Sequence, residues 1–456
     1  MGLQFFPRGG SAHVARNIAR CLPAAGWSPT IVSGSTRGAG DAAAFYAGLD
    51  VRPVDMTAAL AAPDPMRADP PLHPSFEDRP GAPDRVFAAL PDDVFAHHVA
   101  TWADALRRAG AAQADVLHLH HLTPLHEAAA LVAPGVGVVS HVHGTELLML
   151  EAIAADPGRW PHGEAWAARL RRWAQRSARL LVLSGSEIPR AEALLGIDPD
   201  RFVQVPNGFD PEAFVPRDAD RAAFWHRVLV EAPRGWAPGG PPGSVGYTAD
   251  DIAPLREGAP VILYVGRFTE VKRLPLLVEA HAAAATGAAL VIVGGFPGEW
   301  EGEHPLEAVH RTGARDVFLA GWYDHDELPG LLAAADAIVL PSVREGFGQV
   351  LVEAMACGLP AVAVNAYGPA EIVRDGETGW LVAPDDREDL ARALAEVAAY
   401  PDERERRGRA ARRDVLARFA WPALAQRVAA VYDEVRSAGT AGRRRPPASS
   451  AARPSR

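Results

Sequence analysis

The feature that most restricts the fold of this chain is an alternation of short, apolar, β-rich runs with amphipathic helical stretches. Such alternation is typical of βαβ units, whose strands form a parallel sheet. It occurs in two separate series along 456 residues, a length that exceeds one ordinary hydrophobic core. The sequence therefore predicts an α/β protein with two doubly wound domains rather than one barrel.

The individual elements are predicted from the spacing of their apolar residues. The clearest strands are 116–120, 136–142 and 180–184 in the first half, and 261–266, 289–294, 317–320, 337–340 and 361–364 in the second half. The clearest helices are 14–25, 276–285 and 388–399. Only residues 3–6 are left for a strand before the first of these helices, so that strand is short.

The domain boundaries are predicted from composition. Residues 1–206 form a first domain, 207–259 a linker with an insertion, and 260–419 a second domain, because residues 234–243 are too rich in Gly and Pro for a helix or a central strand. The Pro- and Asp-rich residues 61–84 are expected to form a surface excursion. Residues 437–456 lack periodicity and are expected to be a disordered tail.

Charge and cysteine content exclude several classes of function. A formal net charge of −10 argues against a nucleic-acid partner, since phosphate contacts need a basic surface. No apolar stretch approaches the ~20 residues that span a bilayer, and the first residues do not resemble a signal peptide, so we expect a cytoplasmic protein. Cys21 and Cys357 are too few for a disulfide framework or a cysteine-based zinc site.

The most informative segment follows the predicted strand 337–340. A turn containing Gly346 and Gly348 leads into a helix that is expected to begin near Phe347 and to end at Gly358. Open α/β sheets bind ligands at the carboxyl ends of their strands, where this helix starts. The free amides of Phe347, Gly348 and Gln349 are therefore predicted to bind phosphate oxygens.

Two glutamates flank the start of this helix. Glu345 and Glu353 are eight positions apart, or about 10–12 Å along a helix, which is too far for an acid–base pair but suits the two ends of one extended ligand. We expect Glu353 to accept the hydroxyls of a ribose and Glu345 to hold those of a sugar. The alternative is a glutamate favoured by the helix dipole together with an exposed one in mid-helix.

Two cations follow the predicted strand 261–266. Arg267 and Lys272 at this edge could neutralise a diphosphate and stabilise its charge as it leaves. Lys272 is the only lysine in a chain whose other basic residues are all arginines, so its position is informative. The alternative is that both are solvated surface cations.

The first half offers weaker signals. His143 follows a strand within His143-Gly-Thr and is predicted to contact a sugar hydroxyl or to assist at the reacting centre, although the chain has 16 histidines. His118, His120 and His121 have no carboxylate or cysteine at ligand spacing, which favours packing or substrate contact over a metal site. Gly9 and Gly10 precede a helix and could offer amides to a phosphate or a sugar.

Together these motifs resemble those of family 4 of the retaining glycosyltransferases (glycosyl transferases group 1), which have the GT-B fold. The similarity extends from residue 3 to about residue 435 and is most specific over 261–384. It rests on Gly9-Gly10, His143-Gly-Thr, Val205-Pro-Asn-Gly-Phe-Asp210, Gly266-Arg267 with Lys272, Glu345-Gly-Phe-Gly with Glu353-Ala-Met-Ala-Cys-Gly-Leu-Pro360, and Gly368-Pro-Ala-Glu-Ile-Val373.

The resemblance implies two Rossmann-like domains that face each other across a cleft, with the acceptor on the first and the donor on the second. It implies that the helix 420–436 packs back on the first domain. For the donor it implies that Arg267 and Lys272 bind the diphosphate, that Glu353 holds the ribose and Glu345 the sugar, and that the amides of Phe347, Gly348 and Gln349 complete the site. The backbone at Trp322 and Tyr323 would contact the base, His143 the sugar, and Gly9 with Gly10 the diphosphate.

The activity implied by this family is metal-independent and cofactor-free transfer of a sugar, with retention, from a UDP- or GDP-sugar to an acceptor hydroxyl. The acceptor class stays open among a small molecule, a polysaccharide and a lipid, which also leaves open a peripheral membrane contact. An epimerase or phosphorylase on the same fold and a non-catalytic nucleotide-sugar-binding protein are the alternatives. The chain departs from the family in its insertion 217–258 and in Ala366-Tyr-Gly368.

Overall fold

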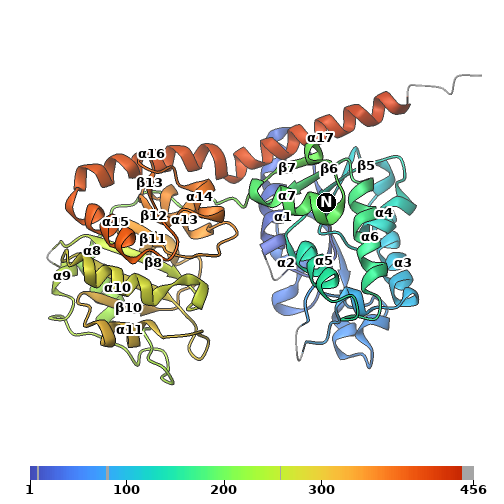
Figure 1. Ribbon diagram of the computed structural model, residues 1–456. Coiled ribbons are helices and arrows are strands. Elements are labelled where there is room, and N and C mark those ends of the chain that lie inside the picture. The colour runs from blue at the N-terminus through green and yellow to red at the C-terminus, as the bar shows by residue number, and fades with distance from the viewer. Residues whose placement is uncertain (8–9, 79–81, 257, 444–456) are drawn as a thin grey trace, which may run out of the picture. The chain divides into compact units, whose positions relative to one another are not determined.

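The computed structural model describes residues 1–7, 10–78, 82–256 and 258–443, and these form two compact units. Unit 1 contains Met1–Pro206 together with the described chain from Leu424 onward, and unit 2 contains Asn207–Ala423. Each unit is built on one parallel sheet surrounded by helices (Figure 1). The predicted α/β class with two doubly wound sheets is confirmed.

The sheet of unit 1 has seven strands in the order β3-β2-β1-β4-β5-β6-β7. Its strands are β1 (Gly2–Leu3), β2 (Thr30–Ser35), β3 (Asp50–Asp55), β4 (Val116–His120), β5 (Gly137–His141), β6 (Arg179–Val182) and β7 (Phe202–Gln204). Its helices are α1 (Gly10–Cys21), α2 (Ala42–Phe45), α3 (Asp92–Arg108), α4 (Leu125–Val132), α5 (Thr145–Ala155), α6 (Gly163–Arg176) and α7 (Ile188–Leu195). The strand order reverses between β1 and β4, which is the topological switch point of this sheet.

The sheet of unit 2 has six strands in the order β10-β9-β8-β11-β12-β13. Its strands are β8 (Val261–Gly266), β9 (Ala289–Gly294), β10 (Val317–Gly321), β11 (Ala337–Leu340), β12 (Ala361–Val364) and β13 (Gly379–Val382). Its helices are α8 (Arg221–His226), α9 (Ala253–Arg256), α10 (Leu274–Ala284), α11 (Pro305–Thr312), α12 (Leu328–Ala333), α13 (Gln349–Ala356), α14 (Tyr367–Ile372), α15 (Arg387–Ala399) and α16 (Pro401–Phe419). Here the switch point lies between β8 and β11.

Several strands that are buried on both faces were predicted, whereas β2, β3, β7 and β13 were not. β9, β11 and β12 are buried at every position, and each is a continuous apolar run in the sequence, as central parallel strands are. β3 was missed because it is an edge strand whose residues are mostly exposed and which contains Pro53, a residue tolerated only at a sheet edge.

Residues 61–84 are more than the surface excursion that their composition suggests. Met66, Leu72 and Phe76 are buried in the core of unit 1. Three well-spaced apolar side chains therefore anchor a segment that is otherwise rich in Pro and Asp.

Residues 207–259 were expected to form a linker with an insertion, but they pack into unit 2. The side chains of Trp225 and Trp236 are fully buried. Their indole N–H groups donate to the carbonyls of Ala334 (2.9 Å) and Gly295 (3.1 Å). Two buried, hydrogen-bonded tryptophans make this segment part of the domain core. Its high Gly and Pro content had instead suggested a linker.

The last helix, α17, runs from Trp421 to Arg443, so residues 437–443 are helical rather than part of the expected tail. Residues 444–456 of that predicted tail lie outside the described residues. From Leu424 onward the helix belongs to unit 1, where Tyr432 packs on Trp27 with ring centroids 4.9 Å apart. Buried apolar residues at helical spacing, Val428, Val431, Tyr432 and Val435, hold it there.

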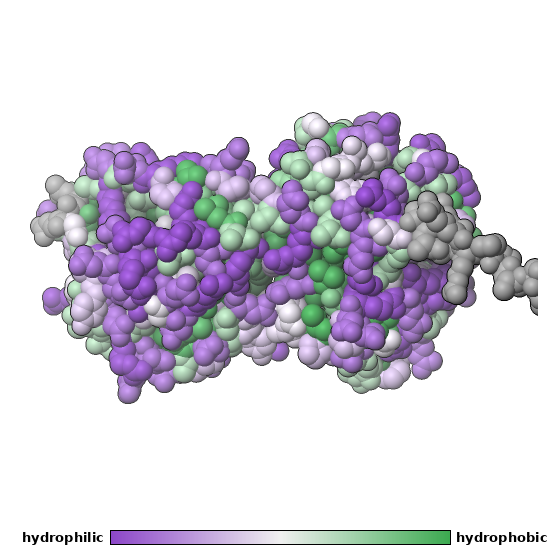
Figure 2. Space-filling model, turned by 90° about the horizontal axis from the view of Figure 1, so that it is seen from above, coloured by the Kyte–Doolittle hydropathy of each residue, from purple (hydrophilic) through white to green (hydrophobic). Residues whose placement is uncertain are grey.

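Seen from the side on which α16 lies, the surface of unit 2 is mostly hydrophilic (Figure 2). Arginines and glutamates of α16 pair with one another there, for example Arg406 with Glu403 at 2.7 Å. This face of unit 2 offers charge rather than an apolar surface to a partner. Within the described residues, no helix is long and apolar enough to cross a membrane.

We predict that Trp225→Ala destabilises unit 2 by about 3–5 kcal/mol, because it removes a fully buried ring and leaves the Ala334 carbonyl unpaired. The measurement is urea unfolding followed by far-UV circular dichroism. Tyr400→Ala, at an exposed aromatic side chain of the same unit, is the control and is expected to change stability by less than about 0.5 kcal/mol. A loss below about 1 kcal/mol for Trp225→Ala would contradict a core role for the insertion.

Candidate functional site

The predicted donor residues of unit 2 gather at the carboxyl edge of its sheet, beside the switch point between β8 and β11. The loop after β8 carries Arg267 and Lys272, and the loop after β11 carries Glu345. The two loops are joined by a hydrogen bond from the amide of Val343 to the carbonyl of Val271 (3.0 Å). Sheets of this kind bind ligands at this position.

Lys272 and Glu345 form a salt bridge, Nζ to Oε2, that the sequence did not predict. Both side chains are largely buried, with 16% and 20% exposed. Glu345 was predicted to hold sugar hydroxyls, but here it neutralises the lysine. An anion that binds Lys272 would therefore share the ammonium with this carboxylate or displace it.

Arg267 differs from Lys272 because its side chain is exposed and has no salt bridge within the described part of the chain. Its backbone is fixed, since the hydroxyl of buried Tyr264 donates to the Arg267 carbonyl at 3.0 Å. The guanidinium therefore contributes a positive charge at this edge of the sheet without a carboxylate to balance it.

Between Glu345 and Gln349, whose own side chains bond Lys272 and Glu353, the chain brings backbone to the site. α13 begins at Gln349, two residues later than predicted, and Gly348 caps it with φ 96°. The Phe347 ring points into the core against Phe419, with centroids 5.7 Å apart. The amides of Gly348 and Gln349 stand at the first turn, where an α-helix leaves its N–H groups without an intrahelical partner.

Gly368 explains why this segment keeps its path. Its amide donates to the Glu345 carbonyl at 3.0 Å. A Cβ at Gly368 would lie 2.4 Å from the Phe347 carbonyl oxygen, so only glycine permits this approach. The departure from the family pattern at Ala366-Tyr-Gly368 therefore keeps a glycine that supports the predicted phosphate loop.

Glu353 is 2% exposed and is held by two residues that the sequence did not single out as its partners. Its Oε1 accepts a hydrogen bond from Gln349 Nε2 (2.9 Å) and lies 2.8 Å from His325 Nε2. Gln349 Nε2 also donates to the carbonyl of Gly208 at 2.9 Å. The hydrogen bond to Glu353 raises the pKa of His325 above its usual value.

His325 lies in the loop after β10 that also contains Trp322 and Tyr323, the residues predicted to contact a base. Trp322 is 46% exposed, whereas Tyr323 is half-buried beneath the guanidinium of Arg234, which lies 4.2 Å from its ring centroid. Through His325 and Glu353, this loop is tied to α13. The only sequence signal for His325 was its place just after a strand end.

The predicted residues of unit 1 lie at the carboxyl edge of that unit's own sheet. His143 follows β5 and precedes α5, whose N-cap is Gly144 with φ 92°. Its Nε2 lies 3.1 Å from Nδ1 of His120, and burial holds the pKa of His143 well below its usual value. Of the glycine pair, Gly9 lies outside the described residues, and Gly10 is the exposed first residue of α1.

The buried carboxylate of Glu146 fixes the His143 turn, a role that the sequence did not reveal. Glu146 Oε2 accepts from the His143 amide (3.2 Å), and Oε1 accepts from the Leu122 amide (3.3 Å) and lies 3.0 Å from His121 Nδ1. Burial alone would raise the pKa of Glu146, but His121 and these hydrogen bonds outweigh burial and hold it below its usual value.

His118, His120 and His141 are buried beside this turn, and ring nitrogens of all three lie within 4.8 Å of one another. Their rings are stacked, with centroids 4.5–5.5 Å apart and planes within 12–22° of parallel. A shared metal ion would have to lie in the plane of each ring, which stacked planes do not allow. The geometry favours packing over chelation.

Two family descriptions match the chain. Glycosyltransferase Family 4 matches residues 8–213, and Glycosyl transferases group 1 matches residues 248–414. Glycogen synthase of Mycobacterium tuberculosis is 31% identical over 396 residues, which cover 81% of this chain and 84% of that protein. The chain belongs to glycosyltransferase family 4. The resemblance read from the sequence is confirmed, and the protein is a glycosyltransferase of the hexosyltransferase type.

One further relative of this glycosyltransferase has a similar sequence, and two solved structures have a similar fold. D-inositol 3-phosphate glycosyltransferase of Kribbella flavida is 32% identical over 274 residues, or 56% of each protein. Sucrose-phosphate synthase of Thermosynechococcus elongatus has a similar structure, with 21% identity, 96% of both chains covered and a TM-score of 0.57. Anabaena HepE in complex with UDP and glucose matches with 17% identity, 95% and 99% covered, and a TM-score of 0.59. These structures show that the fold is GT-B.

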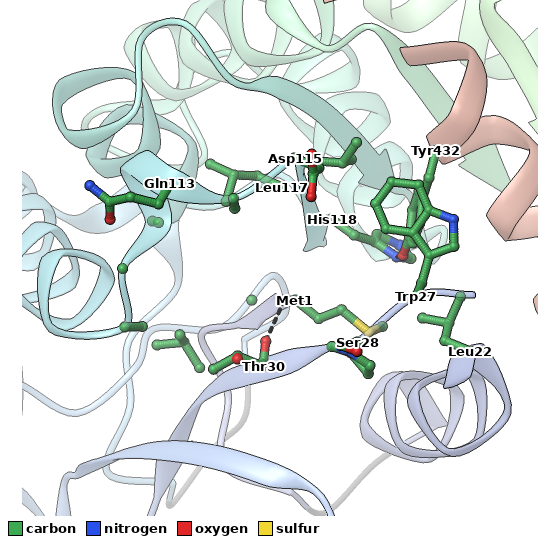
Figure 3. Close-up of a pocket in the computed structure, with 18 of the residues that line it drawn as sticks. Met1, Leu22, Trp27, Ser28, Thr30, Gln113, Asp115, Leu117, His118 and Tyr432 are labelled. Atoms are coloured by element: carbon green, nitrogen blue, oxygen red, sulfur yellow. Dashed lines mark hydrogen bonds between the residues drawn. The ribbon is translucent and has the colours of Figure 1, made fainter. Parts of the chain in front are cut away.

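A cavity of about 420 Å³ in unit 1 lies at the opposite end of the strands from His143 (Figure 3). It is lined by Met1, Thr30 and Val116, which lie at the amino ends of β1, β2 and β4, and by Tyr432 of α17. The Met1 ammonium donates to the Thr30 carbonyl at 2.7 Å, and His118 Nδ1 lies 2.5 Å from the Tyr432 hydroxyl. Because it opens at the amino ends of the strands, it is separate from the site that the glycosyltransferase motifs define.

We predict that His325→Gln lowers the melting temperature more at pH 5.5 than at pH 9. The pKa of His325 is higher in the folded protein than in the unfolded chain, where it is about 6.5, so protonated His325 stabilises the fold. This stabilisation is complete at a pH below about 6.5 and is lost as the pH rises through the pKa of the folded state. Thermal unfolding across this pH range is the measurement. His310→Gln, at an exposed histidine of α11, is the control, and an equal loss at both pH values in His325→Gln would refute a charged pair with Glu353.

Proposed function

We propose that this glycosyltransferase moves a sugar from a UDP- or GDP-sugar to an acceptor hydroxyl, with retention of configuration and without a metal ion. The observation that carries the proposal is the charge at the carboxyl edge of unit 2, where Arg267 and Lys272 follow β8 and the first turn of α13 follows β11, on the two sides of the switch point. Fixed positive charge and free amides together suit a diphosphate.

In this proposal each group has one role. Arg267, Lys272 and the amides of Gly348 and Gln349 bind the diphosphate. Glu353 accepts the ribose hydroxyls in place of its present hydrogen bond from His325. Glu345, released from Lys272, accepts hydroxyls of the donor sugar.

The reaction breaks the bond between the anomeric carbon and the diphosphate oxygen, and the electron pair leaves with that oxygen. Arg267, Lys272 and the helix amides stabilise the negative charge that grows there. The acceptor oxygen bonds to the anomeric carbon from the same face, and its proton passes to the departing phosphate oxygen. His143, held neutral by burial, acts as a hydrogen-bonding partner of the sugar in this scheme.

The acceptor is a hydroxyl compound from one of three classes: a small molecule, a polysaccharide or a lipid. Relatives named as glycogen synthase and as D-inositol 3-phosphate glycosyltransferase support the first two classes. An assay with donor alone separates transfer from epimerisation, because an epimerase needs no acceptor. Donor binding without turnover on any acceptor class would instead indicate a non-catalytic nucleotide-sugar-binding protein.

We predict that Lys272→Ala weakens binding of the best nucleoside diphosphate by about 10- to 100-fold, as expected for one lost charge-assisted contact. Glu345→Gln should bind the same ligand at least as tightly as the unmodified protein, because it removes the carboxylate that competes for Lys272, but should lose most turnover. Calorimetric titration with UDP, GDP and ADP, together with sugar-transfer assays, measures both effects.

The matched control for Lys272→Ala is Arg273→Ala. Arg273 is the neighbouring cation, but it pairs with Asp385 at 2.7 Å. Its loss is expected to leave nucleotide affinity within twofold. Unchanged binding in Lys272→Ala would remove the phosphate role of the lysine, and weakened binding in Glu345→Gln would refute the competition.

A further inference from the structure

Segment 221–247, which is part of the insertion that departs from the family pattern, packs against the open edge of the unit 2 sheet. β10 is the edge strand, and the amide of Leu319 on this strand donates to the Tyr247 hydroxyl at 2.8 Å. Arg234 pairs with Gly321 in a parallel bridge at the end of β10. Gly321 has φ 79°, and a Cβ there would lie 2.0 Å from the Arg234 carbonyl oxygen, so the two backbones are in close contact.

The same segment also forms hydrogen bonds and a salt bridge with the two loops that follow β9 and β10. The buried Trp236 donates to the carbonyl of Gly295, directly after β9, and its ring stacks on Phe268 at 5.6 Å. Arg234 forms a bidentate salt bridge with Glu327, with both N–O distances at 3.0 Å. Glu327 in turn accepts a hydrogen bond from the amide of Asp324 at 3.0 Å, so Arg234 fixes the loop from Trp322 to Glu327.

Each of these two loops presents one exposed aromatic side chain. Phe296 is 53% exposed and Trp322 is 46% exposed, and their rings meet edge to face with centroids 6.2 Å apart. Large aromatic side chains left in contact with water on adjacent loops mark a binding surface better than a packing one. Trp322 is three residues from His325, which contacts Glu353, so Trp322 is on the same loop as the group that bonds the proposed ribose ligand.

We infer that Phe296 and Trp322 bind the donor's nucleobase, with one ring stacked on the face of the base and the other against its edge, and that segment 221–247 positions them through Arg234 and Trp236. The inference rests on the proposed function, because it assigns the base to a nucleotide whose diphosphate lies at Lys272. Arg234 and Trp236 are positioning residues in this scheme, since they hold the two loops and do not touch the ligand. The insertion therefore sets how tightly the donor is bound.

The test compares UDP, GDP and ADP with inorganic pyrophosphate, which has the charge of the diphosphate but no base. Phe296→Ala and Trp322→Ala should each weaken the best nucleoside diphosphate by about 5- to 150-fold, the effect of one base-stacking contact, and should leave pyrophosphate binding unchanged. Arg234→Ala should weaken the nucleotide by about tenfold with little change in kcat, and Arg234→Lys should restore part of the affinity.

Arg221→Ala is the matched control for Arg234→Ala. Arg221 lies in the same segment and also forms a bidentate salt bridge, with Asp336 at 2.9 Å, but Asp336 directly precedes β11 at the amino end of the sheet. The variant Arg221→Ala should lower the stability of the fold without changing nucleotide affinity. If Arg234→Ala does not fold, Arg234→Lys and the two aromatic variants still decide the question.

The outcomes separate this inference from the proposed function. If Lys272→Ala binds both pyrophosphate and nucleotide normally, the proposed function fails. If Lys272→Ala weakens both ligands while Phe296→Ala and Trp322→Ala bind nucleotide normally, the diphosphate site stands and the base assignment is overturned. If the aromatic variants lose affinity but Arg234→Ala and Arg221→Ala behave alike, the positioning role of the insertion is overturned.

Discussion

The salt bridge between Lys272 and Glu345 is the interaction on which the rest of the site depends. It joins the loops after β8 and β11, which diverge at the switch point of the sheet and are also tied by the Val343–Val271 hydrogen bond. The glycine-rich path from Glu345 to α13 is fixed on one side by this pair and on the other by Gly368. A ligand that displaces Glu345 from Lys272 therefore removes one of the contacts that hold the segment leading into α13.

The sequence predicted the parts of the fold that local patterns determine. Central strands such as β9 and β11 are continuous apolar runs, and the cations after β8 follow such a run directly. The edge strand β3 was missed, because it has neither burial on both faces nor an uninterrupted apolar pattern. The packing of Trp236 was also missed, because its partner Gly295 is distant in sequence and no local pattern predicts that contact.

The sequence indicated which residues lie at this edge of the sheet, but not which of them contact one another. Arg267, Lys272, Glu345 and Glu353 all come to the expected edge of one unit. The sequence did not show that Glu345 would form a salt bridge with Lys272. It also did not show that His325 and Gln349 would hydrogen-bond to the buried carboxylate of Glu353. In unit 1, the buried Glu146 supports the His143 turn through contacts that depend on the tertiary fold. Such long-range pairings require the three-dimensional structure.

The single lysine of the chain gives the site a spectroscopic label of its own. Growth with isotope-enriched lysine places one labelled side chain in a 456-residue protein, and that side chain is the salt-bridged Lys272. Its ammonium resonance reports directly on whether a carboxylate or another anion lies beside it, without overlap from any second lysine. The arginine-rich composition thus makes a large enzyme accessible, at this one position, to magnetic resonance methods that usually require much smaller molecules.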